Sequence, residues 1–239
     1  MTSTAPVTQI IHLGFEQNPD AKLDDTGLWA EALDACESPG LQRLYWARSL
    51  EHPEHVELHL VRQSISQHQD WLNSASHRAF LAILGKLSVR VKTTRHAQMK
   101  SWTPTDHSLA RGAPFTGTAI YYNTTEVWND YAWPLWTHIV RHIDGCLGCS
   151  GGPLLEPVVT MPGPLSVSLS GKGEQKRFET GYVVYVGWET TEKHHVYHHT
   201  EHFKQFGNVL RCGNEGFAEY GHVVFEGSRE KGIGKGTRL

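Results

Sequence analysis

Hydrophobic and polar positions follow two periods along the 239-residue chain. Runs that are apolar, β-branched or aromatic and lie between turn residues predict strands, whereas apolar residues that recur every three or four positions predict helices. Strands are predicted over 8–15, 41–49, 56–62, 89–96, 118–124, 181–188 and 218–226. Helices are predicted from Asp24 and over 66–84, 128–143 and 191–210, and Pro134 bends or interrupts the third of them.

The same order of elements occurs in both halves, which predicts an internal duplication. A local match supports it, because the strand-ending residues Arg62 and Trp188 are followed at equal offsets by similar side chains. These are His68, Trp71 and Phe80 in the first half and His194, Tyr197 and Phe206 in the second. In the second half, residues 145–179 are rich in glycine and proline. We expect a long irregular connection there.

Composition narrows the class of protein. Lys and Arg number 22 against 25 Asp and Glu, a net charge of -3 that disfavours a nucleic-acid binder. No stretch approaches the roughly 20 apolar residues of a membrane helix, and the start of the chain lacks the pattern of a secretory signal. The four cysteines are too few for a disulfide scaffold, so we expect a cytoplasmic protein.

The chain contains 16 histidines, and several lie with tyrosines on predicted strands. Strand residues alternate between two faces, so these polar rings oppose aliphatic neighbours. The set is His12, His59, Tyr122, Tyr185 and His222. If this face lines an apolar pocket, a histidine beside a tyrosine can remove one proton and supply another. The alternative is that the rings face water or are hydrogen-bonded core residues.

The segment HHVYHHTEHF carries the second candidate site. On one continuous helix, His194, Tyr197, His198 and Glu201 share a face. A second set has the spacing of a buried stripe: Val196, His199, Phe203, Phe206 and Leu210. One interpretation makes His194 or His198 an acid or base oriented by Glu201. The other is a solvated helix surface.

Metal binding is a third hypothesis. His194 and His198 are four residues apart, as in helical zinc sites, and Glu201 could be a further ligand. Cys146 and Cys149 have the spacing of zinc ligands, but no second cysteine pair follows. Haem has no specific motif in its favour, and the usual nucleotide-binding and serine-hydrolase motifs are missing. We therefore expect no metal and no bound organic cofactor.

Several of these segments resemble the dimeric α+β barrel superfamily, especially fungal proteins with antibiotic-biosynthesis-monooxygenase-like (ABM-like) domains. The resembling segments are Leu44-Tyr45-Trp46-Ala47-Arg48-Ser49, Glu51-x-Pro53, the strand and helix reaching His68 and Trp71, and Trp188-Glu189-Thr190 with His194 and Tyr197. Two departures are Arg62, where Trp is usual, and a second copy without a recognisable Tyr-Trp-x-x-Ser strand.

The resemblance implies an α+β fold of tandem ferredoxin-like repeats. Their antiparallel sheets, with helices outside, would form a dimeric-type α+β barrel within one chain. The expected organisation is a first repeat over 5–97, a linker over 98–114, a second repeat over 115–228 with an irregular insertion over 145–179, and a flexible tail over 229–239. A monomer by internal pairing is expected, or a homodimer.

The function expected from the resemblance and the residues together is a cofactor-independent enzyme of specialised metabolism. It would cyclise, isomerise, eliminate or rearrange a hydrophobic polyketide-, terpenoid- or alkaloid-like intermediate. His194, His198, His12, His59, Tyr122 and Tyr185 would be catalytic, and Trp188, His222, Tyr197, Trp71 and His68 would bind substrate. The alternatives are a cofactor-free ABM-type monooxygenase of a phenolic substrate and a non-catalytic binding or stress-response protein.

Overall fold

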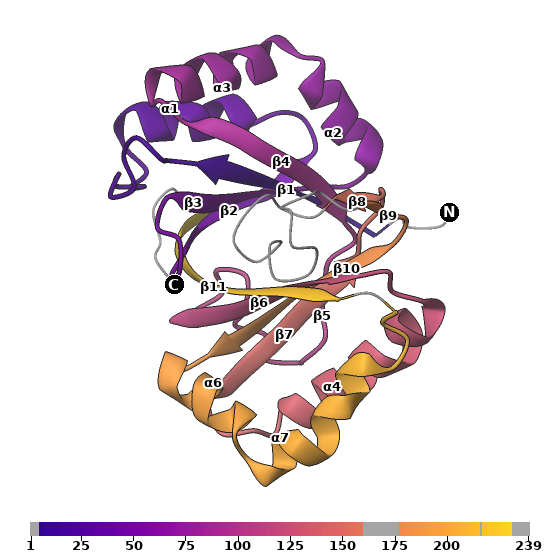
Figure 1. Cartoon of the computed structure of the whole chain (residues 1–239). Coiled ribbons are helices and arrows are strands. Elements are labelled where there is room, and N and C mark those ends of the chain that lie inside the picture. The colour runs from indigo at the N-terminus through magenta and orange to yellow at the C-terminus, as the bar shows by residue number, and fades with distance from the viewer. Residues whose placement is uncertain (1–4, 160–176, 216, 231–239) are drawn as a thin grey trace. The chain divides into compact units, whose positions relative to one another are not determined.

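The computed structural model describes residues 5–159, 177–215 and 217–230, which divide into two compact units (Figure 1). The first unit comprises residues 5–98, Leu109–Gly112 and 222–230. The second comprises Met99–Ser108 and the described part of Ala113–Gly221. Among the described residues, no helix combines the length and apolar character that a membrane-spanning helix requires.

The first unit runs strand, helix, strand, strand, two helices, strand. Its elements are β1 (Val7–Gly14), α1 (Gly27–Cys36), β2 (Leu41–Ser49), β3 (His55–Arg62), α2 (Ile65–Leu72), α3 (Ala75–Lys86) and β4 (Arg90–Ala97). The antiparallel sheet has the order β4-β1-β3-β2, and the later part of β11 (Ala218–Glu230) pairs with β2. All three helices cover one face of this sheet (Figure 1).

The second unit repeats this order with more interruptions. Its elements are β5 (Lys100–Ser101), β6 (Phe115–Tyr122), the π-helix η1 (Trp128–Ala132), α4 (Trp133–Val140), β7 (Cys146–Pro153), β8 (Val158–Val159), β9 (Arg177–Phe178), β10 (Gly181–Trp188), α6 (Thr191–His198), α7 (Glu201–Phe206), the 3-10 helix η2 (Gly207–Arg211) and the start of β11. The main sheet has the order β11-β6-β10-β7-β5, and β8 pairs with β9.

Each sheet divides its residues between two faces. In the first unit, alternate residues such as Leu44, Trp46, Leu58 and Leu60 pack with Trp71 and the other core residues of the helices. In the second unit, the helix-facing positions carry mainly aromatic rings: Phe115, Tyr121, Trp128, Trp133, Trp136, Tyr182, Trp188 and Tyr197. Burying such side chains contributes roughly 1.5–3 kcal/mol each. The opposite, helix-free face of each sheet holds the remaining strand side chains.

The expected α+β class and the antiparallel strands are confirmed. The strand predicted over 41–49 and the strand predicted over 181–188 have the bounds of β2 and β10. The prediction of an irregular connection from 145 onward is wrong for Cys146–Pro153, which form the strand β7. The second half therefore has a strand where the sequence shows no recognisable Tyr-Trp-x-x-Ser pattern. Residues 160–176 of that predicted connection lie outside the described part of the chain.

Two long predicted helices are each interrupted by a hydroxyl side chain that starts a new helix. Ser74 accepts a hydrogen bond from the amide of His77 and begins α3, so the helix predicted over 66–84 is two helices. Thr200 accepts one from the amide of Phe203 and begins α7, which breaks the helix predicted over 191–210. Both are N-caps, which separate helices because they satisfy the first free amides of the next one.

Two further predictions concern a helix start and the C-terminal end. Pro134 stands in the first turn of α4, where the missing amide costs nothing, and η1 precedes it. At the place where Pro134 was predicted to bend or interrupt the helix, the structure changes from a π-helix to an α-helix, with helical backbone at Ala132 and Trp133. The flexible tail predicted over 229–239 is wrong for its first two residues, because β11 continues to Glu230. Residues 231–239 lie outside the described part of the chain.

Candidate functional site

Two predicted catalytic histidines of the first unit meet around one carboxylate on the helix-free face of its sheet. His12 on β1 stands directly opposite Glu57 on β3, and His59 follows Glu57 by two residues on the same face. The Nε2 atom of His59 lies 2.9 Å from Oε2 of Glu57. The Nδ1 atom of His12 lies 4.0 Å from Oε1 of the same carboxylate. We call this set the His12–Glu57–His59 cluster.

Hydrogen-bond partners assign the tautomers of both rings. Arg95 donates from Nη1 to Nε2 of His12 over 3.3 Å, so Nε2 is an acceptor and the ring proton of His12 is on Nδ1, facing Glu57. In His59 the Nε2–H donates to Glu57. Its other nitrogen, Nδ1, is then the acceptor of the neutral ring. A carboxylate that fixes one nitrogen and leaves the other basic is the arrangement that general-base histidines use.

Burial and charge keep His12 neutral. Burial is the main cause that lowers the pKa of His12 to about 3, and the positive charge of Arg95 adds to it, while Glu57 acts in the opposite direction. His12 therefore carries no charge at neutral pH.

Aromatic rings flank His59. Its ring lies 4.6 Å from the ring of Tyr45, which is directly opposite on β2, and 6.0 Å from the ring of Phe225 on β11. His59 is 0% exposed and Tyr45 is 1% exposed. Burial raises the pKa of Tyr45 to about 12, so its hydroxyl keeps its proton. The cluster thus combines a basic imidazole nitrogen with a protonated phenol in apolar surroundings.

The predicted residues of the second unit form a different group, on the helix side of its sheet. The ring of His194 lies 4.9 Å from Trp188 and 4.5 Å from His198. Trp188 also contacts Tyr197, at 5.8 Å between the ring centres. Gly117 lies beneath His194, where an added Cβ would be 3.2 Å from Cε1 of the imidazole. His194 and Tyr197 are thus part of the packing between α6 and the sheet.

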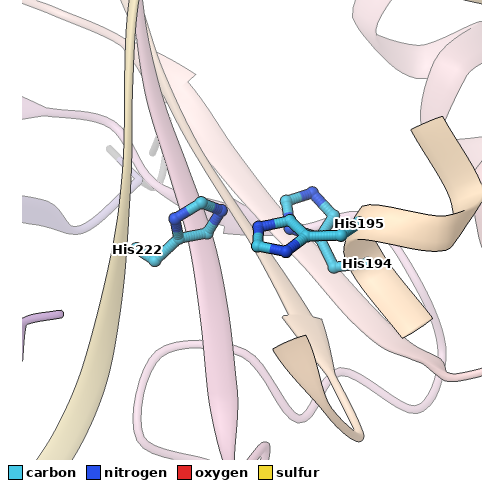
Figure 2. A group of neighbouring side chains, drawn as sticks. All are labelled: His194, His195 and His222. Atoms are coloured by element: carbon cyan, nitrogen blue, oxygen red, sulfur yellow. The ribbon is translucent and has the colours of Figure 1, made fainter. Parts of the chain in front are cut away.

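The helix face expected to join His194, Tyr197, His198 and Glu201 does not exist as such. Glu201 belongs to α7, beyond the break at Thr200. The expected buried stripe is also wrong at Val196, which is 57% exposed. Figure 2 shows His194 and His195 projecting from α6. His222, also drawn there, comes from β11 and belongs to the first unit.

A cavity of about 680 Å³ adjoins His198 in the second unit. Its walls come from α6, α7, η2 and the first residues of β11. They include the aromatic rings of Phe203 and Tyr220 and the cations Lys204 and Arg211. Its size is within the usual range for small-molecule sites. His198 is therefore the predicted catalytic residue of this unit that lines a described cavity.

The other predicted strand residues are placed separately. Tyr122 and Tyr185 lie on the helix-free face of the second unit, and the hydroxyl of Tyr122 donates to Oε2 of Glu219 over 2.7 Å. Tyr185 is opposite Thr118 and Ser150. In the first unit, His222 forms a close contact through Nδ1 with a carboxylate oxygen of Glu51.

His68 and Trp71 lie on the helix side of the first unit, away from the His12–Glu57–His59 cluster. His68 is 0% exposed and its Nε2 donates to the carbonyl of Val7 over 2.9 Å. Arg62 donates to its Nδ1 over 3.1 Å and places its guanidinium 5.1 Å from the Trp71 ring. These contacts anchor α2 to the sheet. The rings of His68 and Trp71 both contact buried groups of the first unit.

The five residues of the metal hypothesis lie on three elements of the second unit, α6, α7 and β7. Among residues 5–159, 177–215 and 217–230, His194, His198 and Glu201 do not gather their ligand atoms into one group. Cys146 and Cys149 lie on β7 and not in a loop. Neither set offers three converging ligands within one unit.

Sequence reasoning missed three residues of this site, Glu57, Arg95 and Tyr45. The segment VELHLVR places Glu57 two residues before His59, and a period of two puts both on one face. That signal was present, but the pairing of Glu57 with His12 depends on the register between β1 and β3. Arg95 was missed for the same reason, because only the register between β1 and β4 brings it near His12.

Known structures share this fold over nearly the whole chain. An anthrone oxidase-like protein has a TM-score of 0.60 and 10% identity, and the match covers 98% of this chain and 95% of that one. A candidate monooxygenase from Lactobacillus acidophilus NCFM has a TM-score of 0.55 and 12% identity, with 95% and 97% covered. Another, from Fusobacterium nucleatum subsp. nucleatum ATCC 25586, has a TM-score of 0.55 and 9% identity, with 97% of each chain covered.

These likenesses show that the chain shares its fold with two candidate monooxygenases and an anthrone oxidase-like protein. With identities of 9–12%, they establish nothing about the reaction. No protein-family model matches the chain, and no curated protein matches it in sequence.

Proposed function

We propose that the protein is an enzyme that removes a proton from a hydrophobic substrate without a bound organic cofactor. The observation that carries this proposal is the His12–Glu57–His59 cluster, in which Glu57 accepts a hydrogen bond from Nε2 of His59 over 2.9 Å. Nδ1 of His59 is the base, and the hydroxyl of Tyr45, which lies beside it on the same face, is the proton donor. Positioned acid–base groups of this kind contribute about 10²- to 10⁴-fold to rate.

Proton removal is the first step of the expected cyclisation, isomerisation, elimination or rearrangement of a polyketide-, terpenoid- or alkaloid-like intermediate. The names of two neighbouring folds favour a second candidate reaction, in which the carbanion reacts with dioxygen. Oxidation of a CH2 group by one O2 gives a carbonyl group and one water, so the atoms balance without a further reductant. Both reactions require the same base.

The proposal includes the architecture expected from sequence. Both units have the sheet order of a ferredoxin-like repeat, β4-β1-β3-β2 in the first and β11-β6-β10-β7 in the second. We propose that they are tandem copies, paired as in a dimeric α+β barrel, in a cytoplasmic monomer or homodimer. The sedimentation mass of the purified chain tests the oligomeric state, and an experimental structure tests the pairing.

Anthrone in deuterated buffer is a suitable probe, because its CH2 group is acidic and its ring system is apolar. We expect deuterium to enter that CH2 group faster with the protein than without it, and more slowly with the His59→Gln variant. Oxygen uptake, measured in parallel with an electrode, identifies the monooxygenase reaction. Saturable binding of anthrone, with exchange no faster than in protein-free buffer, would support the non-catalytic binding protein and contradict the proposal.

A further inference from the structure

Two thiols lie on the same face of β7, although they are three residues apart. In a regular strand, Cys146 and Cys149 would point to opposite faces. Here Gly148 pairs with Gly187, while Cys146 pairs with the next residue, Trp188, so Leu147 is the extra residue of a β-bulge. The bulge changes the alternation. Cys149 belongs to the hydrophobic core of the second unit, and Cys146 packs against the same core.

The two thiols share a hydrogen bond, and the bulge supplies a second donor. The Cys149 thiol and the Gly148 amide both hydrogen-bond to the sulfur of Cys146. Gly148 has a φ of 150°, which favours glycine, and an added Cβ would be 2.5 Å from Cα of Asp106. The hydrogen bond from Cys149 is the main cause that lowers the pKa of Cys146. The same hydrogen bond, with burial, raises the pKa of Cys149.

The four cysteines differ in exposure and in the groups that surround the sulfur. Cys149 and Cys36 are fully buried, and burial raises the pKa of the Cys36 thiol strongly. Cys212 is exposed, and its sulfur approaches the carbonyl of Asn208. Cys146 is half-buried and has two donors to its sulfur. It therefore combines access with stabilisation of the thiolate, which is the reactive form.

We propose that Cys146 and Cys149 form a dithiol that hydroperoxides oxidise to a disulfide. The Cys146 thiolate attacks one oxygen of the peroxide and breaks the O–O bond, giving a sulfenic acid and a hydroxide ion. The Cys149 thiol then attacks the sulfenic sulfur and releases water. In sum, two thiols and one hydrogen peroxide give one disulfide and two waters. This activity is independent of the acid–base reaction proposed above.

The test uses the full chain, hydrogen peroxide and thiol alkylation. Trypsin releases both residues in the peptide 142–172, which contains no other cysteine. After peroxide, that peptide should be lighter by two hydrogen atoms and should resist alkylation until it is reduced. We expect Cys146 to react at least about tenfold faster than Cys212, the exposed control. The Cys212→Ala variant should form the linked peptide as the wild type does.

Two single variants assign the roles. Cys146→Ser should leave Cys149 reduced, and Cys149→Ala should accumulate a sulfenic acid at Cys146, which dimedone traps. Circular dichroism and melting midpoints identify any variant that fails to fold, and the wild-type comparison with Cys212 needs no variant. The proposal is overturned if the wild-type peptide keeps two alkylatable thiols after peroxide, or if Cys212 is oxidised as fast as Cys146.

Discussion

Arg62 donates a hydrogen bond from Nη1 to Nδ1 of the buried His68 over 3.1 Å. Arg62 is the last residue of β3 and His68 lies in the first turn of α2, so this contact fixes the angle at which the helix leaves the sheet. In the second unit, Trp188 and His194 occupy the same offsets and meet ring to ring at 4.9 Å. The junction between a strand and the following helix is thus held by a hydrogen bond in the first unit and by an aromatic contact in the second.

The first prediction concerns acid stability. Burial, with Arg62 nearby, lowers the pKa of His68 to about 4, against 6.5 in the unfolded chain. Below pH 6.5 the unfolded chain binds a proton that the folded chain does not bind. Stability should therefore be complete above pH 6.5 and decrease as the pH falls toward 4, by up to about 3 kcal/mol from this residue. Urea unfolding between pH 4 and pH 8 (about 0.5-unit steps) measures it.

The matched variant is His68→Gln, which keeps a donor for the carbonyl of Val7 but cannot take up the proton. This variant should be less stable than the wild type at pH 7, and its stability should depend less on pH. His12 contributes in the same direction, since its pKa is also lowered, so His12→Asn serves as a second comparison. Equal pH dependence in the wild type and His68→Gln would contradict the assignment.

The second prediction locates the catalytic unit. His59→Gln should lower proton exchange of anthrone by about 100-fold, because the variant loses the proposed base. His198→Gln tests the other location, since His198 lines the cavity of the second unit. His138→Gln is the control, because His138 is an exposed histidine on α4. A large loss in His198→Gln, with none in His59→Gln, would move the base to the second unit.

The third prediction concerns the end of α3. Ser88 has a φ of 58° and follows a helix end in which the amide of Val89 donates to the carbonyl of Leu84 and that of Ser88 to Gly85. Helices that end in this way favour glycine at the position of Ser88, because other residues are strained there. Ser88→Gly should raise the free energy of unfolding by about 0.5–1 kcal/mol, after the loss of backbone entropy is included. A lower urea midpoint would show that the serine side chain stabilises this turn.

The fourth prediction compares two glycines of β11. At Gly227 an added Cβ would be 2.2 Å from Cζ2 of Trp46, an indole that is 2% exposed. At Gly221 the nearest atom, Oγ1 of Thr118, would be 3.6 Å away, which is an ordinary contact. Gly227→Ala should cost about 1–3 kcal/mol, whereas Gly221→Ala should change stability by less than about 0.5 kcal/mol. The thermal midpoints of the two variants test this prediction. Similar decreases of the midpoint in both variants would show that the Trp46 side chain moves to make room for the added methyl group.

Local patterns predicted β10 well because it is dense in valines and aromatic residues, and they predicted β2 because its apolar run contains Tyr45 and Trp46. They failed for β7, CLGCSGGP, because glycine has low strand propensity. The structure supplies the reason for Gly151, where an added Cβ would be 3.0 Å from the indole nitrogen of Trp133 and from the ring of Tyr182. Helix breaks at Ser74 and Thr200 were missed because the apolar spacing continues across them.

The candidate site was predictable only in part. His12 and His59 follow from the alternation of their strands, but their common partner follows from strand register, which a single sequence does not specify. In the second unit, the helix break separates Glu201 from His194 and His198. The residue types therefore indicated the kind of chemistry that is proposed. The register between distant strands determines which of these residues lie together.

The strand β11 begins in the second unit and ends in the first, where it pairs with β2. A fragment that stops after β4 would lack β11 and would expose the edge of β2. A fragment that starts at β5 would contain β11 but not β2, so the later half of β11 would have no strand to pair with. Recombinant dissection into halves should therefore yield insoluble fragments.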